Sequence, residues 1–203
     1  MNILMPELEF DPIEHVYTYR GQVIEGVTTI LDRAGLIPHN HHGQVPRERG
    51  RLLHQAIEYA ALDDLNEDTL DPALRGYVMA WRKFMRNHRV KPIAIEVVMA
   101  HPELSYGGTI DMIAKMENQV VGIDFKTGVP MPWHDYQLAG YEMLTNRNCD
   151  LLPIHAVVPI WFDVYLNQDG DYRIGNRLGT RKSPYHIFNA AHICAHARMQ
   201  NGG

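Results

Sequence analysis

The chain has 203 residues, of which 45% are hydrophobic, and its formal net charge is −5. That length and apolar content suffice for one well-packed domain, and the lack of any run of eighteen apolar residues excludes a membrane-spanning helix. The opening residues lack the basic start and apolar stretch of a signal peptide, so we expect a cytoplasmic protein. Because the net charge is negative, any nucleic-acid binding would have to rest on local basic patches.

The two cysteines, Cys149 and Cys194, allow at most one disulfide bond. So low a cysteine content is typical of a reducing compartment. It also excludes an iron–sulfur cluster held by four cysteines.

The first predicted elements form a small β unit over residues 10–30. Apolar and polar residues alternate on either side of an Arg-Gly turn, which indicates a β-hairpin. Thr28 is placed to cap a short helix that begins at Ile30. We expect this hairpin and the loop after it, residues 1–45, to cover one edge of a core formed by residues 46–203.

The loop over residues 35–43 holds three histidines, His39, His41 and His42. A zinc site needs defined ligand spacing and a fourth partner, and none is apparent. We therefore expect a flexible, solvated loop.

A helix is predicted over residues 46–65, where Leu53 and Ile57 have helical spacing. His54 lies on this helix, and a single helical histidine is commonly a partly buried side chain with no ligand. A basic cluster at the start of the helix is either solvated or able to contact phosphate, and it consists of Arg47, Arg49 and Arg51.

A second helix is predicted over residues 71–88, with its aromatic residues facing the core. The strand predicted after it, residues 93–101, contains a single acid, Glu96. A glutamate inside an apolar strand is unfavourable unless it is paired or bound to metal, or lies at an edge facing water. We expect Glu96 near the level of Thr109 on the next strand.

Residues 109–126 predict a β-hairpin with a two-residue Glu-Asn turn, since Asn tolerates a positive φ at the second turn position. That turn places Asp111 directly opposite Asp124. Side chains alternate between faces along a strand, so Lys126 projects from the same face as both aspartates.

Two carboxylates about 5 Å apart repel each other by roughly 3 kcal/mol at an effective dielectric constant of about 20. Directly opposed like charges also destabilise a sheet. A divalent cation would compensate Asp111 and Asp124, and oxygen ligands of this kind suit magnesium or manganese. Lys126 would add a positive charge beside that site. The alternative is a surface hairpin with two solvated aspartates and a lysine.

The rest of the chain adds a helix over residues 133–145, strands over residues 154–166 and 171–175, and a final helix over residues 184–199. Gln137 and Tyr141 lie four apart on the first of these helices and therefore share a face.

His192 and His196 are four apart on the final helix, but no third ligand is near them, so we expect ordinary surface histidines. A second basic patch precedes that helix and consists of Arg177, Arg181 and Lys182.

Together these residues resemble the motifs of the PD-(D/E)XK nuclease superfamily, in particular its RecB-type branch. Gly-Thr-Ile-Asp, Ile-Asp-Phe-Lys and Gln-x-x-x-Tyr occur in the order and at the spacing of that branch. Within that branch, these motifs most resemble those of the mitochondrial genome maintenance exonuclease and of phage-encoded exonucleases of similar size. The resemblance implies an α/β protein with a single restriction-endonuclease-like domain, in which a central mixed β-sheet is flanked by helices and preceded by the N-terminal β-hairpin.

The resemblance also implies roles for individual residues. Asp111 matches the first aspartate, and Asp124 and Lys126 match the D-x-K pair. Gln137 and Tyr141 would brace the lysine and help to place the nucleic acid backbone. The metal ligands implied for one or two Mg²⁺ or Mn²⁺ ions are His54, Glu96, Asp111, Asp124 and the backbone carbonyl of Phe125.

The function implied is metal-dependent hydrolysis of phosphodiester bonds by an exonuclease acting on single-stranded DNA or DNA ends, in recombination, repair or phage DNA processing. A single-strand-annealing or recombination protein is the partner expected for such an enzyme. The alternatives are a structure-specific endonuclease of the same superfamily, a non-catalytic DNA-binding module on a nuclease fold, and a zinc protein built on the histidine-rich segments.

Overall fold

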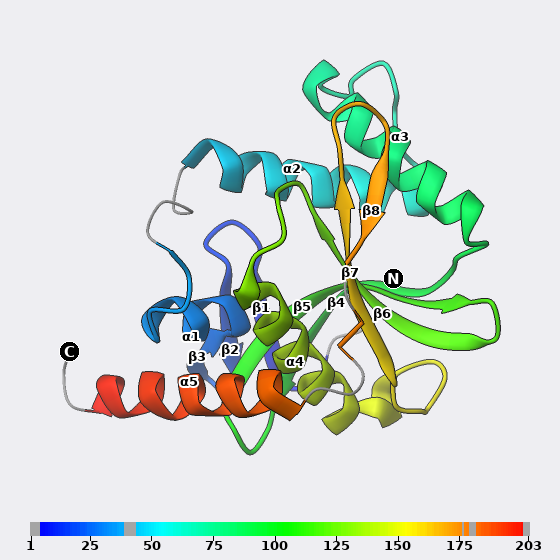
Figure 1. The fold of residues 1–203 in the computed structure, drawn as a ribbon. Coiled ribbons are helices and arrows are strands. Elements are labelled where there is room, and N and C mark those ends of the chain that lie inside the picture. The colour runs from blue at the N-terminus through cyan, green and yellow to red at the C-terminus, as the bar shows by residue number, and fades with distance from the viewer. Residues whose placement is uncertain (1–4, 39–43, 176, 179–181, 201–203) are drawn as a thin grey trace.

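The computed structural model describes residues 5–38, 44–175, 177–178 and 182–200, and the side chains of all of these except residues 44–47, 182, 199 and 200. They form an α/β protein built on a mixed eight-stranded sheet flanked by helices, as the sequence predicts (Figure 1). The elements are β1 (Leu8–Asp11), β2 (Val16–Tyr19), β3 (Gln22–Gly26), α1 (Val27–Arg33), α2 (Gln44–Ala61), α3 (Pro72–Asn87), β4 (Lys91–His101), β5 (Tyr106–Met116), β6 (Gln119–Lys126), α4 (Pro132–Arg147), the short 3₁₀ helix η2 (Cys149–Leu151), β7 (Ile160–Leu166), β8 (Tyr172–Ile174) and α5 (Lys182–Gln200).

The topology of the sheet leaves a gap along one edge of β5. β4 pairs with β5 along nearly its whole length, antiparallel, and occupies the other edge. On the edge with the gap, the start of β5 pairs in parallel with β3 at residues 106–107, and its end pairs antiparallel with β6 from residue 112 onward. Residues 108–111 lie between these two partners. Such a point, where neighbouring strands diverge, is a common place for a binding site in α/β sheets.

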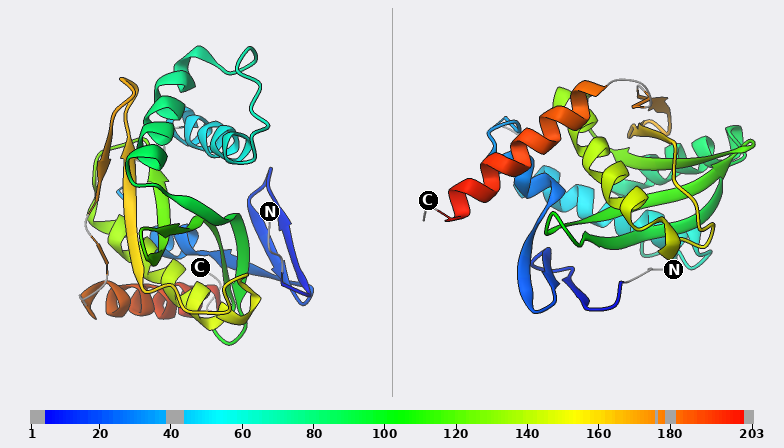
Figure 2. Two further views of the ribbon diagram at one scale, coloured as in Figure 1. Left: turned by 90° about the vertical axis from the view of Figure 1, so that its right-hand side faces the viewer. Right: turned by 90° about the horizontal axis from the view of Figure 1, so that it is seen from below.

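The helices lie on both faces of the sheet (Figures 1 and 2). Leu138 of α4 and Phe188 of α5 pack with α1 in one hydrophobic core. Leu53 of α2 and Phe84 of α3 belong to a second core on the other face, which also contains Phe125 of β6. The two layers hold the central strands rigidly, and therefore fix the side chains that project from them.

A glycine lets α4 approach β5 closely at the gap. A Cβ atom on Gly108 would lie 3.0 Å from Cε1 of Tyr141 and 3.1 Å from Cδ2 of Leu144. Both distances are tighter than ordinary van der Waals contacts, so a larger residue would push the helix away. The close approach brings the α4 face that carries Tyr141 over the residues that precede Asp111.

Two helix boundaries differ from the prediction for local reasons. α1 begins at Val27, directly after the extended residue Gly26, and not at Ile30 with a Thr28 cap. Val27 is already buried, so the chain turns straight from β3 into the helix. α2 ends at Ala61 and not at residue 65, because the backbone just after Ala61 adopts a left-handed conformation, which ends the helix.

The predicted strand over residues 154–166 is also shorter, since β7 begins at Ile160. His155 has a left-handed backbone with φ +47°, and Pro159 lacks the N–H group needed for a ladder bond. None of the helices that the structure describes combines the length and apolar character needed to cross a bilayer.

Candidate metal and catalytic site

Three potential metal ligands from different elements meet at Asp111, the last residue of the gap. They are His54 from α2, Glu96 from β4 and Asp111 itself from β5. Nδ1 of His54 lies 3.2 Å from Oδ1 of Asp111 and 3.5 Å from Oε1 of Glu96. The ligand atoms of the three residues lie within 4.8 Å of one another, and the described part of the chain contains no other such group of three. Two carboxylates and an imidazole at this spacing could hold a divalent metal ion.

Glu96 reaches this group through an unusual backbone conformation. Its neighbours pair as Ile95 with Met112 and Val97 with Ile110, so Glu96 lies level with Asp111. The expected level, that of Thr109, is wrong by two residues because the loop between β4 and β5 does not define the register from sequence alone. Glu96 has φ +47°, a left-handed value that costs a non-glycine residue of order 1–3 kcal/mol. Strain of this kind clusters at functional sites.

Both carboxylates of the group act on the His54 imidazole. Burial alone favours the neutral ring, but the charges and hydrogen bonds of Asp111 and Glu96 outweigh it and raise the pKa of His54 well above its ordinary value. The two acids therefore favour the protonated imidazole. Binding of a metal ion through Nδ1 of His54 would release that proton.

The hairpin that carries the aspartates has the predicted register. β5 and β6 pair from Met112 with Ile123 to Met116 with Gln119, which is the alignment expected from the turn. One step beyond that ladder, Oδ2 of Asp111 accepts a hydrogen bond of 2.6 Å from the backbone N–H of Phe125. The Asp111 side chain thus replaces a ladder bond where the two strands separate.

Asp124 and Lys126 form a buried ion pair next to the three ligands. The ammonium of Lys126 contacts Oδ2 of Asp124, whose residue is only 3% exposed. Asp124 therefore faces the lysine and is not part of the group formed by His54, Glu96 and Asp111. Burial raises the pKa of Asp124, although the lysine partly opposes this. Burial disfavours the charged lysine, but the nearby carboxylates Asp124 and Asp163 outweigh it and raise the pKa of Lys126.

Gln137 fixes the direction of the lysine. Lys126 donates a 2.7 Å hydrogen bond to Oε1 of Gln137. The other end of the amide donates to the hydroxyls of Thr28 on α1 and Tyr141 on α4, each at 3.0 Å. The lysine also lies 5.6 Å from the centroid of the Trp133 ring. Gln137 thus contacts the lysine directly, whereas Tyr141 is linked to the lysine through Gln137.

Asp163 is an acid of this site that the sequence analysis did not single out. It lies on β7, paired in register with Asp124, and is 2% exposed. Burial and the charge of Asp124 raise the pKa of Asp163 to about 8. The sequence feature that could have identified Asp163 is the same one that identified Glu96, namely a single acid inside an apolar strand. The strand here is Ile-Trp-Phe-Asp-Val-Tyr-Leu.

The predicted basic patches are only partly described. The side chains of Arg47, Arg181 and Lys182 lie outside the described residues, as do the loop histidines His39, His41 and His42. Arg51 and Arg177 are exposed. The guanidinium of Arg49 lies 5.8 Å from the centroid of the Tyr77 ring.

The histidines of α5 have a structural role. The His192 and His196 rings stack with centroids 6.3 Å apart, and Nε2 of His192 lies 2.8 Å from the carbonyl oxygen of Leu104. No third ligand joins them among the described residues.

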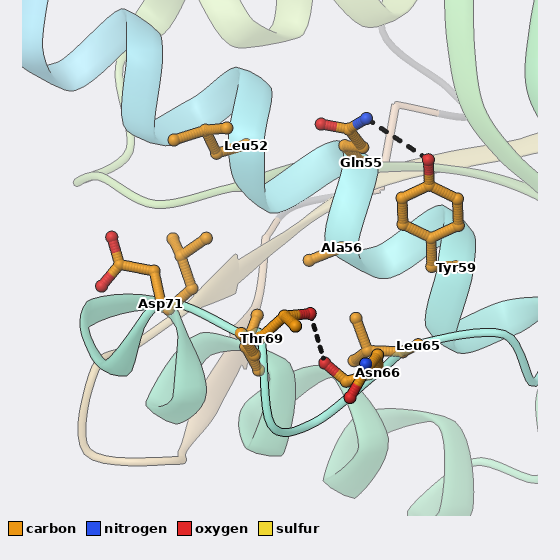
Figure 3. A pocket seen from close by; sticks show the side chains of 10 residues that line it. Leu52, Gln55, Ala56, Tyr59, Leu65, Asn66, Thr69 and Asp71 are labelled. Atoms are coloured by element: carbon orange, nitrogen blue, oxygen red, sulfur yellow. Dashed lines mark hydrogen bonds between the residues drawn. The ribbon is translucent and has the colours of Figure 1, made fainter.

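A separate pocket lies between α2 and the segment that leads to α3 (Figure 3). Leu52, Ala56 and Tyr59 line it from α2, with residues of the segment opposite. Their helical spacing places them on the side of α2 away from His54. The pocket is thus distinct from the candidate site.

Comparisons with known proteins agree with the fold. No protein-family model and no curated protein matches the chain. A solved structure from Eubacterium rectale, of a protein provisionally named an exonuclease, is similar with a TM-score of 0.52 and 11% identity, covering 88% of this chain and 82% of that one. An alkaline exonuclease from Laribacter hongkongensis gives a TM-score of 0.48 at 11% identity, covering 87% of this chain and 88% of the other. The first likeness shows that this chain has an α/β nuclease-like fold.

Proposed function

We propose that this chain is a divalent-metal-dependent deoxyribonuclease of the PD-(D/E)XK superfamily, RecB-type branch, acting as an exonuclease on single-stranded DNA or DNA ends. One observation carries the proposal: the group of His54, Glu96 and Asp111 adjoins the buried pair of Asp124 and Lys126 on a nuclease-like fold. We further propose that residues 1–203 form one nuclease domain, with the hairpin at its N-terminus.

The donor set fits the metal that this activity requires. His54, Glu96 and Asp111 would hold the ion, with Asp124 and the carbonyl of Phe125 as the further ligands that the resemblance implies. When bound, such an ion polarises the scissile phosphate and lowers the pKa of a water molecule. Hard carboxylate oxygens select Mg²⁺ or Mn²⁺ over softer metals.

Lys126 would act as a fixed positive charge. Its pKa is raised by the surrounding carboxylates, so the amine stays protonated at neutral pH and is unsuited to act as a general base. A protonated ammonium instead stabilises negative charge that develops on the phosphate and orients the attacking water. Gln137 holds the ammonium in one direction, which keeps it ready for that purpose.

Attack of water on phosphorus would form a new P–O bond and break the bond to the 3′ oxygen. The products would be a 5′-phosphate and a 3′-hydroxyl, and the proton lost by water would end on the departing oxygen. The exposed Arg51 and Arg177 are our candidates for contacts to backbone phosphates, together with the predicted Arg47, Arg49, Arg181 and Lys182.

Digestion of end-labelled DNA tests this function. We expect the protein to degrade linear single strands with Mg²⁺ or Mn²⁺, to stop in EDTA, and to leave a closed single-stranded circle intact. Asp111→Asn should abolish cleavage, while Asp171→Asn, at an exposed acid paired with Lys83, should not. Cleavage of the circle would indicate an endonuclease, and DNA binding without turnover in any metal would indicate a non-catalytic module. Cleavage that persists in EDTA would refute the metal mechanism.

A further inference from the structure

The sheet places a second acid beside the buried ion pair. β6 and β7 run parallel, with Asp124 paired to Asp163 and Lys126 paired to Tyr165. Paired residues of adjacent strands project from the same face, and so do residues two apart on one strand. All four side chains therefore share the face of the sheet that α4 covers, with the two carboxyls side by side.

A hydrogen bond from Tyr165 holds one oxygen of Asp163, and the Asp163 carboxyl also hydrogen-bonds with Asp124. Oδ2 of Asp163 accepts a hydrogen bond of 3.1 Å from the hydroxyl of Tyr165. That hydroxyl lies 2.8 Å from Nδ1 of His134 at the start of α4, and all three side chains are buried. Apart from that contact between the two carboxyls, Oδ1 of Asp163 has no hydrogen-bond donor among the described residues.

A buried carboxyl oxygen without a donor destabilises a fold by about 1–3 kcal/mol. An apolar residue would pack into β7 without that cost, as Phe162 and Val164 do on either side. The buried acid is therefore not explained by the packing of the sheet. It is explained if Asp163 serves the neighbouring pair of Asp124 and Lys126.

We propose that Asp163 is a positioning residue of the nuclease site, which keeps the Lys126 ammonium on the sheet when Asp124 turns toward His54, Glu96 and Asp111. The inference rests on the proposed function. In this structure Oδ2 of Asp124 contacts the lysine and Asp124 lies outside the group of His54, Glu96 and Asp111, so a turn of Asp124 toward that group would loosen its contact with the lysine. Gln137 alone would then hold the ammonium.

Asp163 offers the second acceptor that this exchange needs. When ionised, its carboxylate favours the charged form of Lys126. A carboxyl oxygen accepts a hydrogen bond from an ammonium whether or not the other oxygen of the group carries a proton. The role assigned to Asp163 therefore does not depend on its protonation state. The Tyr165 hydroxyl, fixed by His134, keeps the acceptor pointed toward the pair.

Two substitutions test the assignment. Asp163→Leu removes both oxygens and keeps the branching and the number of side-chain heavy atoms, whereas Asp163→Asn keeps one acceptor oxygen. We expect Asp163→Leu to lower kcat on linear single-stranded DNA about tenfold or more with little change in KM, and Asp163→Asn to recover much of that loss. Asp171→Asn, on the same strand hairpin but outside the site, is the matched control.

Titration calorimetry with Mn²⁺ on the DNA-free protein separates positioning from a merely structural role. Asp163→Leu should weaken Mn²⁺ binding about three- to tenfold, because Asp124 stays committed to the lysine. The same substitution should change Mn²⁺ affinity by less than about twofold in a Lys126→Met background, where no lysine holds Asp124. If Asp163→Leu does not fold, Asp163→Asn and Tyr165→Phe, tested in both backgrounds, replace it.

Wild-type Mn²⁺ affinity and kcat in Asp163→Leu, or equal loss of affinity in both backgrounds, would overturn the assignment. These outcomes leave the proposed function intact as long as the wild-type protein cleaves DNA with metal. Absence of cleavage by the wild-type protein would instead refute the proposed function itself.

Discussion

Removal of the Lys126 charge should destabilise the protein through Asp124. In Lys126→Met the carboxylate stays buried without its ammonium partner. Opposite charges about 3 Å apart attract by roughly 5.5 kcal/mol at an effective dielectric constant of about 20. Loss of one partner from a buried pair costs about 3–5 kcal/mol in measured cases. We therefore expect Lys126→Met to lower the free energy of unfolding by about 3–4 kcal/mol at pH 8.

The destabilisation should depend on Asp124 and on pH. Asn at position 124 carries no charge, so the double variant Asp124→Asn/Lys126→Met should recover about 2–3 kcal/mol relative to Lys126→Met. Burial already raises the pKa of Asp124, and loss of the lysine raises it further. The folded variant then binds a proton that the unfolded chain releases, so its stability falls as the pH rises and recovers as the pH falls.

Urea unfolding of the wild-type, single and double variants at pH 5 and pH 8 measures both effects. Lys83→Met is the control, since the pair of Lys83 with Asp171 is exposed and screened by solvent, so its loss should leave the stability nearly unchanged. The reasoning that the pair is buried and coupled would be refuted by either of two results. One is that the free-energy changes of the two single variants simply add in the double variant. The other is that Lys126→Met lowers the free energy of unfolding equally at the two pH values.

Three other perturbations have defined outcomes. In EDTA, thermal melts should show a stabilising contribution from His54 that is fully present below about pH 6.5 and is lost as the pH rises through the raised pKa of the folded state. His54→Leu should abolish this pH dependence. An unchanged pH profile in the variant would mean that another group causes the effect. Gln137→Leu should lower kcat about 10- to 100-fold with a small change in Tm, because the lysine loses its orienting acceptor; unaltered kinetics would show that the contact is dispensable. Gly108→Ala should destabilise the protein by about 1–3 kcal/mol in urea unfolding, since the new Cβ crowds Tyr141, and a wild-type midpoint would mean that α4 shifts freely.

The sequence was sufficient where local chemistry decides the structure. The two-residue turn set the register between β5 and β6, which correctly brought Asp111 and Asp124 to the same end of the hairpin. Even there the left-handed residue is Glu117, with φ +56°, and not Asn118 as expected. The type of turn determines which of its residues takes the left-handed conformation. The number of turn residues alone determines the register between β5 and β6.

Other features depend on contacts between distant segments. The level of Glu96 follows from how β4 meets β5 and from its own left-handed φ, and neither is visible in a strand pattern. Asp124 faces Lys126 because α4 brings Gln137 to the same ammonium. Which residue of β7 lies beside Asp124 depends on how the chain crosses over between the parallel strands β6 and β7, and sequence periodicity does not specify that. Asp163 was therefore visible as a buried acid in the sequence, but not as part of the site.

Anomalous diffraction from crystals grown with Mn²⁺ would test the proposed metal site most directly. We predict a peak about 2.2 Å from carboxylate oxygens of Asp111 and Glu96, beside the His54 imidazole, with Asp124 turned away from Lys126. No peak in the gap beside β5 under conditions in which the enzyme cleaves DNA, or a peak only at other residues such as the α5 histidines, would contradict it.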